Sequence, residues 1–248
     1  MADRLSGKVC VITGAAGGIG GAAAAAFERE GAHVVGADLI EHQVGELSLR
    51  ADVTDESAVA GLYARVREKL GRIDVLFNNA GIAAGDDASV LETSLEAWER
   101  VQATNLRSVF LCCKHGIPHL IESGGGSVIN TASFVAVMGS ATSQISYTAS
   151  KGGVLALSRE LGVEFAKQGV RVNALCPGPV DTPLLRDIFA ADPAEAQRRL
   201  VHVPMGRFAR VDEIANAALF LAGDESSYVN ATEFLVDGGI SGAYTTPL

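Results

Sequence analysis

The chain has 248 residues, of which 48% are hydrophobic, and a formal net charge of -9 at pH 7. This size allows a substantial core, and α/β folds of this length often form one domain. The negative charge and the absence of a long Lys/Arg run exclude a nucleic-acid footprint. No apolar stretch reaches the roughly 18 residues that span a membrane, and residues 1–8 contain no apolar leader. We therefore expect a soluble cytoplasmic protein with no nucleic-acid and no membrane partner.

The cysteines and histidines do not suggest a metal site. The four cysteines form no Cys-x-x-Cys pair and lie mostly in apolar runs, which favours buried reduced thiols. They are Cys10, Cys112, Cys113 and Cys176. His115 and His119 stand four residues apart without an obvious third ligand, so we expect no metal there.

The first predicted strand leads into a glycine-rich loop. Residues 8–12 form a short, β-branched apolar run, typical of a strand buried on both faces of a parallel sheet. Residues 13–20 then supply four glycines and pass into an alanine-rich helical run. Glycines permit a tight turn, and a helix N-terminus offers amide donors and partial positive charge. The order strand, turn, helix predicts a pyrophosphate-binding loop rather than a flexible loop of small residues.

The second predicted strand, residues 33–37, ends at Asp38, about twenty residues beyond the loop. A carboxylate at this position can accept hydrogen bonds from an adenosine ribose, although a capping or surface aspartate is the alternative. Residues 39–47 are too few, and too interrupted by Gly45, for a crossover helix, so we expect an irregular connection.

A third strand, residues 47–51, precedes a helix predicted over residues 56–70. Thr54 or Asp55 provides the side chain that caps this helix. The next buried strand covers residues 73–77.

Asn-Asn-Ala-Gly follows that strand at residues 78–81. Ligands of open α/β sheets bind at the carboxyl ends of the strands, so these residues suit a crevice, with a simple turn as the alternative. Ser94 is expected to cap the following helix, and residues 101–115 read as a long apolar helix. Asn105 lies on that helix and, if buried, needs hydrogen-bond partners.

The stretch from Tyr147 to Lys151 contains the strongest candidate for a general acid/base. It follows a strand predicted over residues 126–131 and opens a helical run to residue 161, which places the two side chains on one helix face. An ammonium near the phenol lowers the pKa of the phenol, as a general acid/base near neutral pH requires. A Tyr-x-x-x-Lys match alone also arises by chance, from an aromatic residue and a solvated lysine.

The remaining elements continue the alternation of strands and helices. Residues 170–175 form a strand, a less regular segment extends to about residue 206, and a helix and a last strand cover residues 211–222 and 233–236. The pattern predicts an α/β fold: a single doubly wound, Rossmann-type parallel sheet with helices on both faces, with residues 1–248 as one domain.

Several separate motifs now match one family. They are Thr13, Gly14, Gly18 and Gly20; Asp52 and Val53; Asn78, Asn79, Ala80 and Gly81; Asn105; Ser133; Tyr147 and Lys151; and Pro177, Gly178 and Thr182. In this order and spacing the chain resembles the short-chain dehydrogenase/reductase family over essentially its whole length. It is similar to the single-domain members of about 250 residues, which include 3-oxoacyl-carrier-protein reductases and alcohol or steroid dehydrogenases.

The resemblance implies an oxidoreductase that interconverts a secondary alcohol and a ketone by hydride transfer. Its implied catalytic residues are Asn105, Ser133, Tyr147 and Lys151. Ser133 would bind the substrate oxygen, and Tyr147 would give or take its proton. Lys151 would lower the pKa of Tyr147 and bind the nicotinamide ribose, and Asn105 would hold a water that links Lys151 to solvent.

The resemblance also implies a dinucleotide site, in which Thr182 would bind the carboxamide. We expect it to consist of Gly14, Gly17, Gly18, Ile19, Gly20, Asp38, Asp52, Val53, Asn79, Ala80, Gly81, Tyr147, Lys151, Pro177, Gly178, Val180 and Thr182. NAD is the expected cofactor, because Asp38 would face the 2′-phosphate of NADP. Gly17 and Leu39 stand where NADP-dependent relatives commonly place a basic residue, and we expect Arg50 to be solvated or paired with Asp52.

One spacing departs from the family pattern. Ser133 lies 14 residues before Tyr147, one more than in many relatives, and the loop between them contains four further hydroxyl residues. These are Ser140, Thr142, Ser143 and Ser146. Ser133 remains the candidate because it follows its strand directly.

Several questions stay open at this level. A dinucleotide-binding, redox-sensing protein without turnover is the alternative function, since a fold does not establish activity. A sugar, a secondary alcohol, a steroid and a β-ketoacyl thioester all remain possible substrates. We expect a substrate lid at about residues 183–206, where Arg186 reads as a solvated arginine, with contact to an acid or phosphate as the alternative. We also expect a homotetramer, from the resemblance and from the apolar helical runs 106–113 and 154–165.

Overall fold

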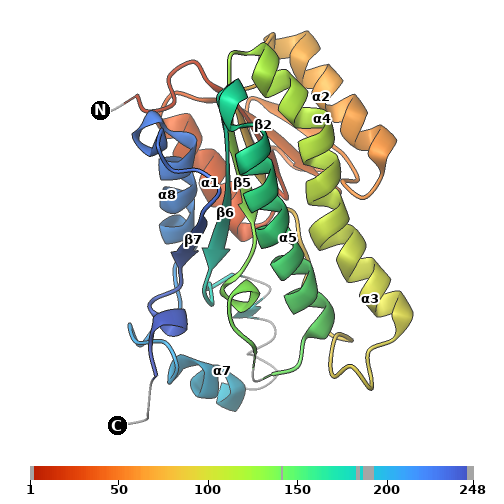
Figure 1. Cartoon of the computed structure of the whole chain (residues 1–248), viewed down its shortest axis with the longest axis vertical. Helices are drawn as coiled ribbons and strands as arrows, with labels where there is room; N and C mark the ends of the chain where they lie inside the picture. The colour runs from red at the N-terminus through yellow and green to blue at the C-terminus, as the bar shows by residue number, and fades with distance from the viewer. Residues whose placement is uncertain (1–2, 141, 183–184, 187–192, 245–248) are drawn as a thin grey trace.

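The computed structural model describes residues 3–140, 142–182, 185–186 and 193–244. In this part of the chain seven parallel strands form one sheet in the order β3-β2-β1-β4-β5-β6-β7 (Figure 1). The strands are β1 Val9–Thr13, β2 His33–Asp38, β3 Leu47–Arg50, β4 Val75–Asn78, β5 Gly126–Thr131, β6 Val170–Pro177 and β7 Glu233–Val236. The helices are α1 Gly18–Arg29, α2 Glu56–Leu70, α3 Leu95–Gln102, α4 Ser108–Glu122, α5 Ile145–Glu164, α7 Pro193–Leu200 and α8 Val211–Ala222.

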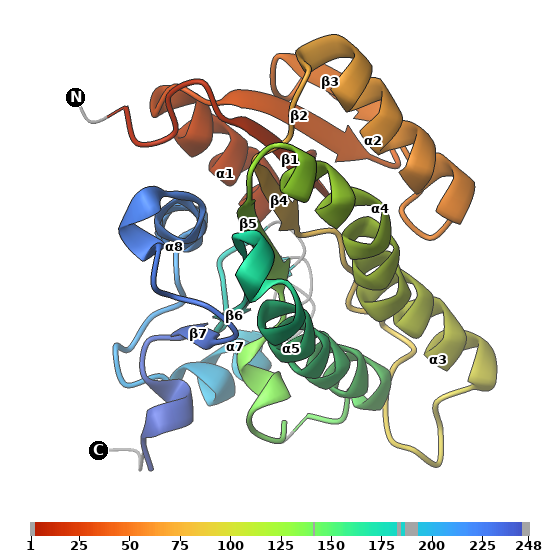
Figure 2. The same cartoon turned by 45° about the horizontal axis from the view of Figure 1, so that its top comes forward.

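Helices cover both faces of the sheet (Figure 2). Side chains alternate along a strand, so Val9 and Val11 of β1 pack into the cluster under α2, α4 and α5. Cys10 and Ile12 point the other way, into the cluster with α1 and α8. Strands buried on both faces explain the nearly continuous apolar runs of the sequence. The predicted doubly wound parallel sheet is confirmed.

Several local predictions are also confirmed. Helices α2 and α8 and strands β5 and β7 have the predicted bounds. The Asp55 side chain caps α2 by accepting hydrogen bonds from the backbone N–H groups of residues 57 and 58, and Ser94 caps α3. The connection between β2 and β3 is irregular, and the four cysteines are buried and free.

The long helix predicted over residues 101–115 is wrong in its bounds. The structure has α3, then a π-helical turn over Ala103–Arg107, and then α4. The Ser108 N–H donates to the carbonyl of Ala103, five residues earlier, which marks one extra residue in the helix. Apolar periodicity does not reveal such an insertion, because the flanking helices keep their own apolar faces.

The less regular segment before residue 206 contains a helix that sequence reasoning missed. Helix α7 lies beyond the carboxyl ends of β6 and β7 (Figure 1). Of the predicted lid at about 183–206, residues 183–184 and 187–192 lie outside the described residues. Within the described ranges, no helix combines the length and apolar character that crossing a membrane requires.

Candidate active site

The site lies where the strand order reverses, between β1 and β4 at the centre of the sheet. The hydroxyl of Thr13, at the end of β1, accepts hydrogen bonds from the backbone N–H groups of Asn79 (3.1 Å) and Ala80 (3.2 Å). The Asn79 side chain donates back to the carbonyl of Thr13 at 3.2 Å. These bonds hold the carboxyl ends of β1 and β4 together. Asn79 therefore has a structural role in the wall of the crevice.

The loop after β1 has no room for side chains at two positions. Gly14 has a φ of 67°, and a Cβ there would stand 2.9 Å from the Cα of Ala80. A Cβ at Gly20 would stand 2.1 Å from the carbonyl oxygen of Gly14. Gly17 is the N-cap of α1, and among the described residues no side chain caps this helix and no acidic residue occupies its first turn. The N–H groups of its first turn, at residues 18–20, therefore present a partial positive charge.

Asp38 ends β2 beside this loop, as predicted. Its carboxylate accepts hydrogen bonds from the N–H of Ala16 (3.0 Å) and the N–H of Ile40 (3.3 Å), which hold it at the rim of the crevice. Arg50 on β3 lies opposite Asp38 on β2 in the register of the two strands. The Nε of Arg50 donates to the carbonyl of Leu39 at 3.0 Å. Arg50 is exposed, and its side chain bonds to the backbone of Leu39 and not to the carboxylate of Asp52.

Asp52 and Val53 lie in the turn after β3. The Asp52 carboxylate accepts from the N–H (2.8 Å) and the hydroxyl (2.7 Å) of Thr54, and Val53 is buried. The loop therefore has a fixed shape next to β2.

Three of the predicted catalytic side chains meet at the end of β5. Ser133 follows this strand, and its hydroxyl is close enough to the phenol of Tyr147, in the first turn of α5, to act on the pKa of that phenol. Lys151, only 3% exposed, lies one turn further on, with its Nζ 5.6 Å from the centre of the Tyr147 ring. Its Nζ donates to the carbonyl of Thr131 at 2.6 Å. Ser146 has a fully buried side chain whose hydroxyl finds no partner among the described residues.

Burial dominates the electrostatics of this trio. It raises the pKa of Tyr147, and the hydrogen bond with Ser133 only partly opposes the rise. Burial also lowers the pKa of Lys151 to about 8, so its ammonium is less strongly charged near neutral pH than an exposed lysine. In the protein alone the pKa of Tyr147 is therefore raised, opposite to the predicted lowering, because desolvation of the phenol is the largest cause.

Asn105 lies in the π-helical turn and is 0% exposed. Its Oδ1 accepts from the N–H of Ile82 (2.8 Å), and its Nδ2 donates to the Ile82 carbonyl (2.9 Å) and to the Ser150 hydroxyl (3.2 Å). A Cβ at Gly81 would stand 3.3 Å from the Asn105 Oδ1 and 3.4 Å from the Lys151 Nζ. The amide thus ties the loop after β4 to α5, close to Lys151.

The far wall of the crevice follows β6. Gly178 passes so close to β7 that a Cβ would stand 2.6 Å from the Cα of Asp237, and Val180 is buried. The Thr182 hydroxyl accepts from the N–H of Leu185 at 3.3 Å. Arg186 is exposed, as predicted, and also pairs with the carboxylate of Asp181 through two contacts of 2.6 and 2.9 Å.

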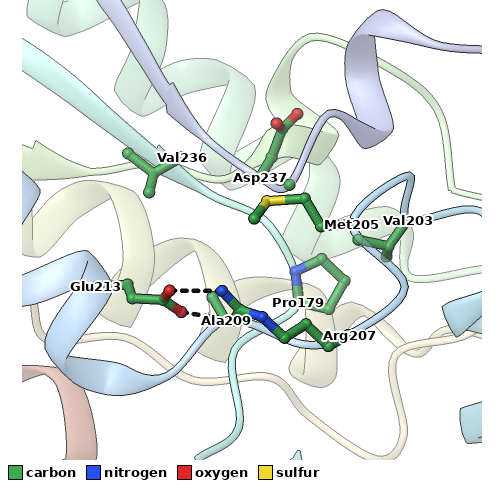
Figure 3. Close-up of a pocket in the computed structure, with 9 residues that line it drawn as sticks. Pro179, Val203, Met205, Arg207, Ala209, Glu213, Val236 and Asp237 are labelled. Atoms are coloured by element: carbon green, nitrogen blue, oxygen red, sulfur yellow. Dashed lines mark hydrogen bonds and ion pairs between the residues drawn. The ribbon is translucent and has the colours of Figure 1, made fainter.

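A small cavity of about 100 Å³ lies behind this wall (Figure 3). Pro179, Val203 and Met205 supply apolar surface, and the ion pair of Arg207 with Glu213 closes one side (2.7 and 2.8 Å). Sequence reasoning did not single out these residues, which come from three separate segments.

Asp87 is a further residue that sequence reasoning missed. Its carboxylate, on the loop after β4, accepts hydrogen bonds from the backbone N–H groups of Ser146 (2.9 Å) and Tyr147 (2.8 Å). About sixty residues separate the partners, so no local pattern could have indicated the contact.

Comparison with known proteins gives one consistent result. Residues 14–241 match the family model described as enoyl-(acyl carrier protein) reductase. Cis-4-hydroxycyclohexanecarboxylate dehydrogenase of Sinomonas cyclohexanicum is 40% identical over 251 residues, which cover 96% of this chain and 98% of that protein. The 3-oxoacyl-[acyl-carrier-protein] reductase of Thermotoga maritima (strain ATCC 43589 / DSM 3109 / JCM 10099 / NBRC 100826 / MSB8) is 38% identical, with 96% and 99% covered.

The fold agrees with these sequence matches. The crystal structure of levodione reductase superposes with a TM-score of 0.91 at 34% identity, covering 97% of this chain and 100% of that one. Agreement of sequence and fold over nearly the whole length confirms the resemblance that the motifs indicated. The chain belongs to the short-chain dehydrogenase/reductase family of oxidoreductases.

Proposed function

We propose that this oxidoreductase interconverts a secondary alcohol and a ketone with NAD(H), using Tyr147 as the general acid/base. One observation carries the proposal: the Ser133 hydroxyl, the Tyr147 phenol and the Lys151 ammonium meet at the end of β5. They lie at the same edge of the sheet as the glycine loop after β1, because all the strands are parallel.

The residues of the crevice fit a dinucleotide. The uncapped first turn of α1 suits a pyrophosphate, and the close approaches at Gly14 and Gly20 leave the loop backbone uncovered by side chains. Asp52, Val53 and Ala80 would line the adenine side, and Pro177, Gly178, Val180 and Thr182 the nicotinamide side. When bound, the nicotinamide accepts or supplies the hydride.

The chain's own residues handle the proton and the substrate oxygen. Ser133 would hydrogen-bond that oxygen, and Tyr147 would take its proton during oxidation or return it during reduction. Lys151, held by Thr131, would bind ribose hydroxyls and stabilise the phenolate while it exists. Asn105, which lies close to Lys151, would hold a water through which Lys151 exchanges protons with solvent.

Asp38 supports NAD over NADP as the cofactor. Its carboxylate stays at the end of β2, where two backbone N–H groups hold it, and would accept from two ribose hydroxyls. A 2′-phosphate at the same place would meet a like charge. Arg50 is the partner of Asp38 in the sheet register, and its Nε donates to the Leu39 carbonyl.

The substrate class is tested by direct assay. The names of the relatives suggest three probes: cis-4-hydroxycyclohexanecarboxylate with NAD, and levodione or a 3-oxoacyl thioester with NADH. We expect turnover, read as the change in NADH absorbance, with at least one alcohol or ketone probe. Tight dinucleotide binding without turnover across a wide panel of alcohols and ketones would instead favour the redox-sensing alternative.

We further propose a homotetramer of single-domain chains, with the lid at about residues 183–206. Phe110 on α4 is 48% exposed and lines a shallow groove with Gln102 and Leu106, a surface that association would bury. Light scattering should give four times the chain mass of 25.7 kDa. A monomer at micromolar concentration would contradict this.

A further inference from the structure

The helix that carries Tyr147 and Lys151 has no local cap. Its N-cap residue, Gln144, makes no side-chain capping bond, and its first turn contains no acidic residue. Helices α2 and α3, by contrast, are capped by Asp55 and Ser94 immediately before them in the sequence. The first N–H groups of α5 therefore need a partner from elsewhere.

Asp87 is that partner. Its two carboxylate oxygens each accept one backbone N–H, Oδ1 from Ser146 at 2.9 Å and Oδ2 from Tyr147 at 2.8 Å. The neighbouring Ala88 carbonyl accepts the N–H of Ile145 at 3.4 Å. Three successive N–H groups of the first turn are thus bonded to one short piece of the loop after β4.

The charge of Asp87 has no other compensation in the described structure. The residue is 8% exposed, and no ion pair among the described residues includes it, whereas the adjacent Asp86 pairs with Arg100 at 2.5 Å. A buried carboxylate is tolerated only when strongly hydrogen-bonded, and a helix N-terminus supplies both donors and positive partial charge. The carboxylate of Asp87 is therefore stabilised by the N-terminus of α5.

The first turn of α5 is also held from a second side. The Nε2 of Gln102, the last residue of α3, donates to the carbonyl of Ser146 at 2.9 Å. Lys151, one turn later, has its own separate anchor on the carbonyl of Thr131. Loosening the first turn should therefore displace Tyr147 more than Lys151.

We propose that Asp87 is a positioning residue, which holds the backbone of Tyr147 so that its phenol meets Ser133 and the substrate oxygen. This inference rests on the function proposed above for Tyr147. Because Tyr147 donates its own N–H to the carboxylate, losing the bond releases the residue itself. A displacement of about 1 Å can lower a rate by about 10²-fold.

The test compares two aspartates with the same local chemistry. Asp87→Asn keeps one acceptor and turns an N–H donor toward the helix, and Asp87→Ala keeps none. We expect kcat to fall about tenfold in the first and more in the second, since misplacement by up to 1 Å lowers rates by as much as about 10²-fold. The dissociation constant of NADH should stay within about twofold in both, because one pair of positioning bonds is lost and no cofactor contact is.

Asp55→Asn is the matched control. Asp55 also accepts two N–H groups at a helix N-terminus, at 2.7 and 3.2 Å, but its helix carries no proposed catalytic residue. We expect both Asn variants to lose thermal stability, the buried Asp87 more than the exposed Asp55, and an unchanged kcat at saturating NADH only in Asp55→Asn. Gln102→Leu, which removes the milder second contact, should lower kcat by a smaller factor than Asp87→Asn.

Two measurements keep the outcomes distinct. Amide hydrogen exchange at residues 146 and 147 should accelerate in Asp87→Asn, and unchanged exchange would overturn the proposal without any need for turnover. Full activity of Asp87→Asn alongside an inactive Tyr147→Phe would overturn only this inference. Full activity of Tyr147→Phe would overturn the proposed function itself.

Discussion

One side of the crevice is formed by backbone groups and the other by buried polar side chains. The loop of residues 13–20 is shaped by backbone: glycines at close approaches and the free N–H groups of α1. The α5 side is shaped by buried polar side chains, among them Asn105, Ser133 and Lys151, which bond to one another or to distant backbone. Substitutions on the first side should therefore change dinucleotide affinity, and those on the second should change turnover, except at Lys151, where both should change because Lys151 would also bind the nicotinamide ribose.

The largest effect should come from Tyr147→Phe. The ring keeps its packing but loses the transferable proton, so kcat should fall by about 10²–10⁴-fold, the usual contribution of general acid/base catalysis. Dinucleotide affinity, measured by fluorescence titration, should stay close to wild type. A parallel loss of affinity would show that the two sides are not separable in this way.

The cofactor side should discriminate between NAD and NADP. Like charges facing each other in an interface cost several kcal/mol, so kcat/KM should favour NAD by at least roughly a hundredfold. Asp38→Ala should narrow this ratio, and Leu39→Arg added to it should narrow it further. Equal kcat/KM values in the wild type would mean that Asp38 does not face the ribose.

Gly20→Ala should break the loop itself. Its new Cβ would stand 2.1 Å from a backbone oxygen, and such overpacking typically costs about 1–3 kcal/mol of stability. NADH affinity should fall with it, as read by thermal melts with and without NADH. Gly21→Ala is the matched control, since its Cβ would lie 3.4 Å from the nearest such oxygen. Equal melting temperatures for the two variants would argue against the steric explanation.

A further effect, on stability and not on activity, concerns the α5 side. Burial lowers the pKa of Lys151 to about 8 from the ordinary 10.5, so the unfolded chain binds more protons between these pH values. The wild type should therefore gain stability as pH rises from about 8 to 10.5, relative to Lys151→Met. Each pKa unit corresponds to about 1.4 kcal/mol, which urea denaturation at pH 7 and pH 10 resolves. The exposed Lys167→Met should show no such trend, and a flat difference for Lys151→Met would contradict the burial argument.

The sequence predicted what local patterns encode. The bounds of α2 follow from Asp55 before it and Gly71, with a φ of 76°, after it. The places of Ser133, Tyr147 and Asp38 at strand or helix ends follow from the alternation of elements. The cap from Asp87 depends on contacts across about sixty residues, and the rise in the pKa of Tyr147 depends on burial. Neither is visible in a window of neighbouring residues.

The π-helical turn at Ala103–Arg107 restricts which insertions and deletions this part of the chain can accept. One extra residue in a helix changes the angular phase of everything beyond it by about 100°. Here that phase change lets Asn105 reach Ile82 and Ser150 while α4 keeps its apolar face on the sheet. Deleting Thr104 would restore a regular helix but rotate one half against the other. The number of residues between Ser94 and Ser108 is therefore fixed by the fold. Deleting one residue in this segment should disrupt the packing of α3 and α4 more than most substitutions would.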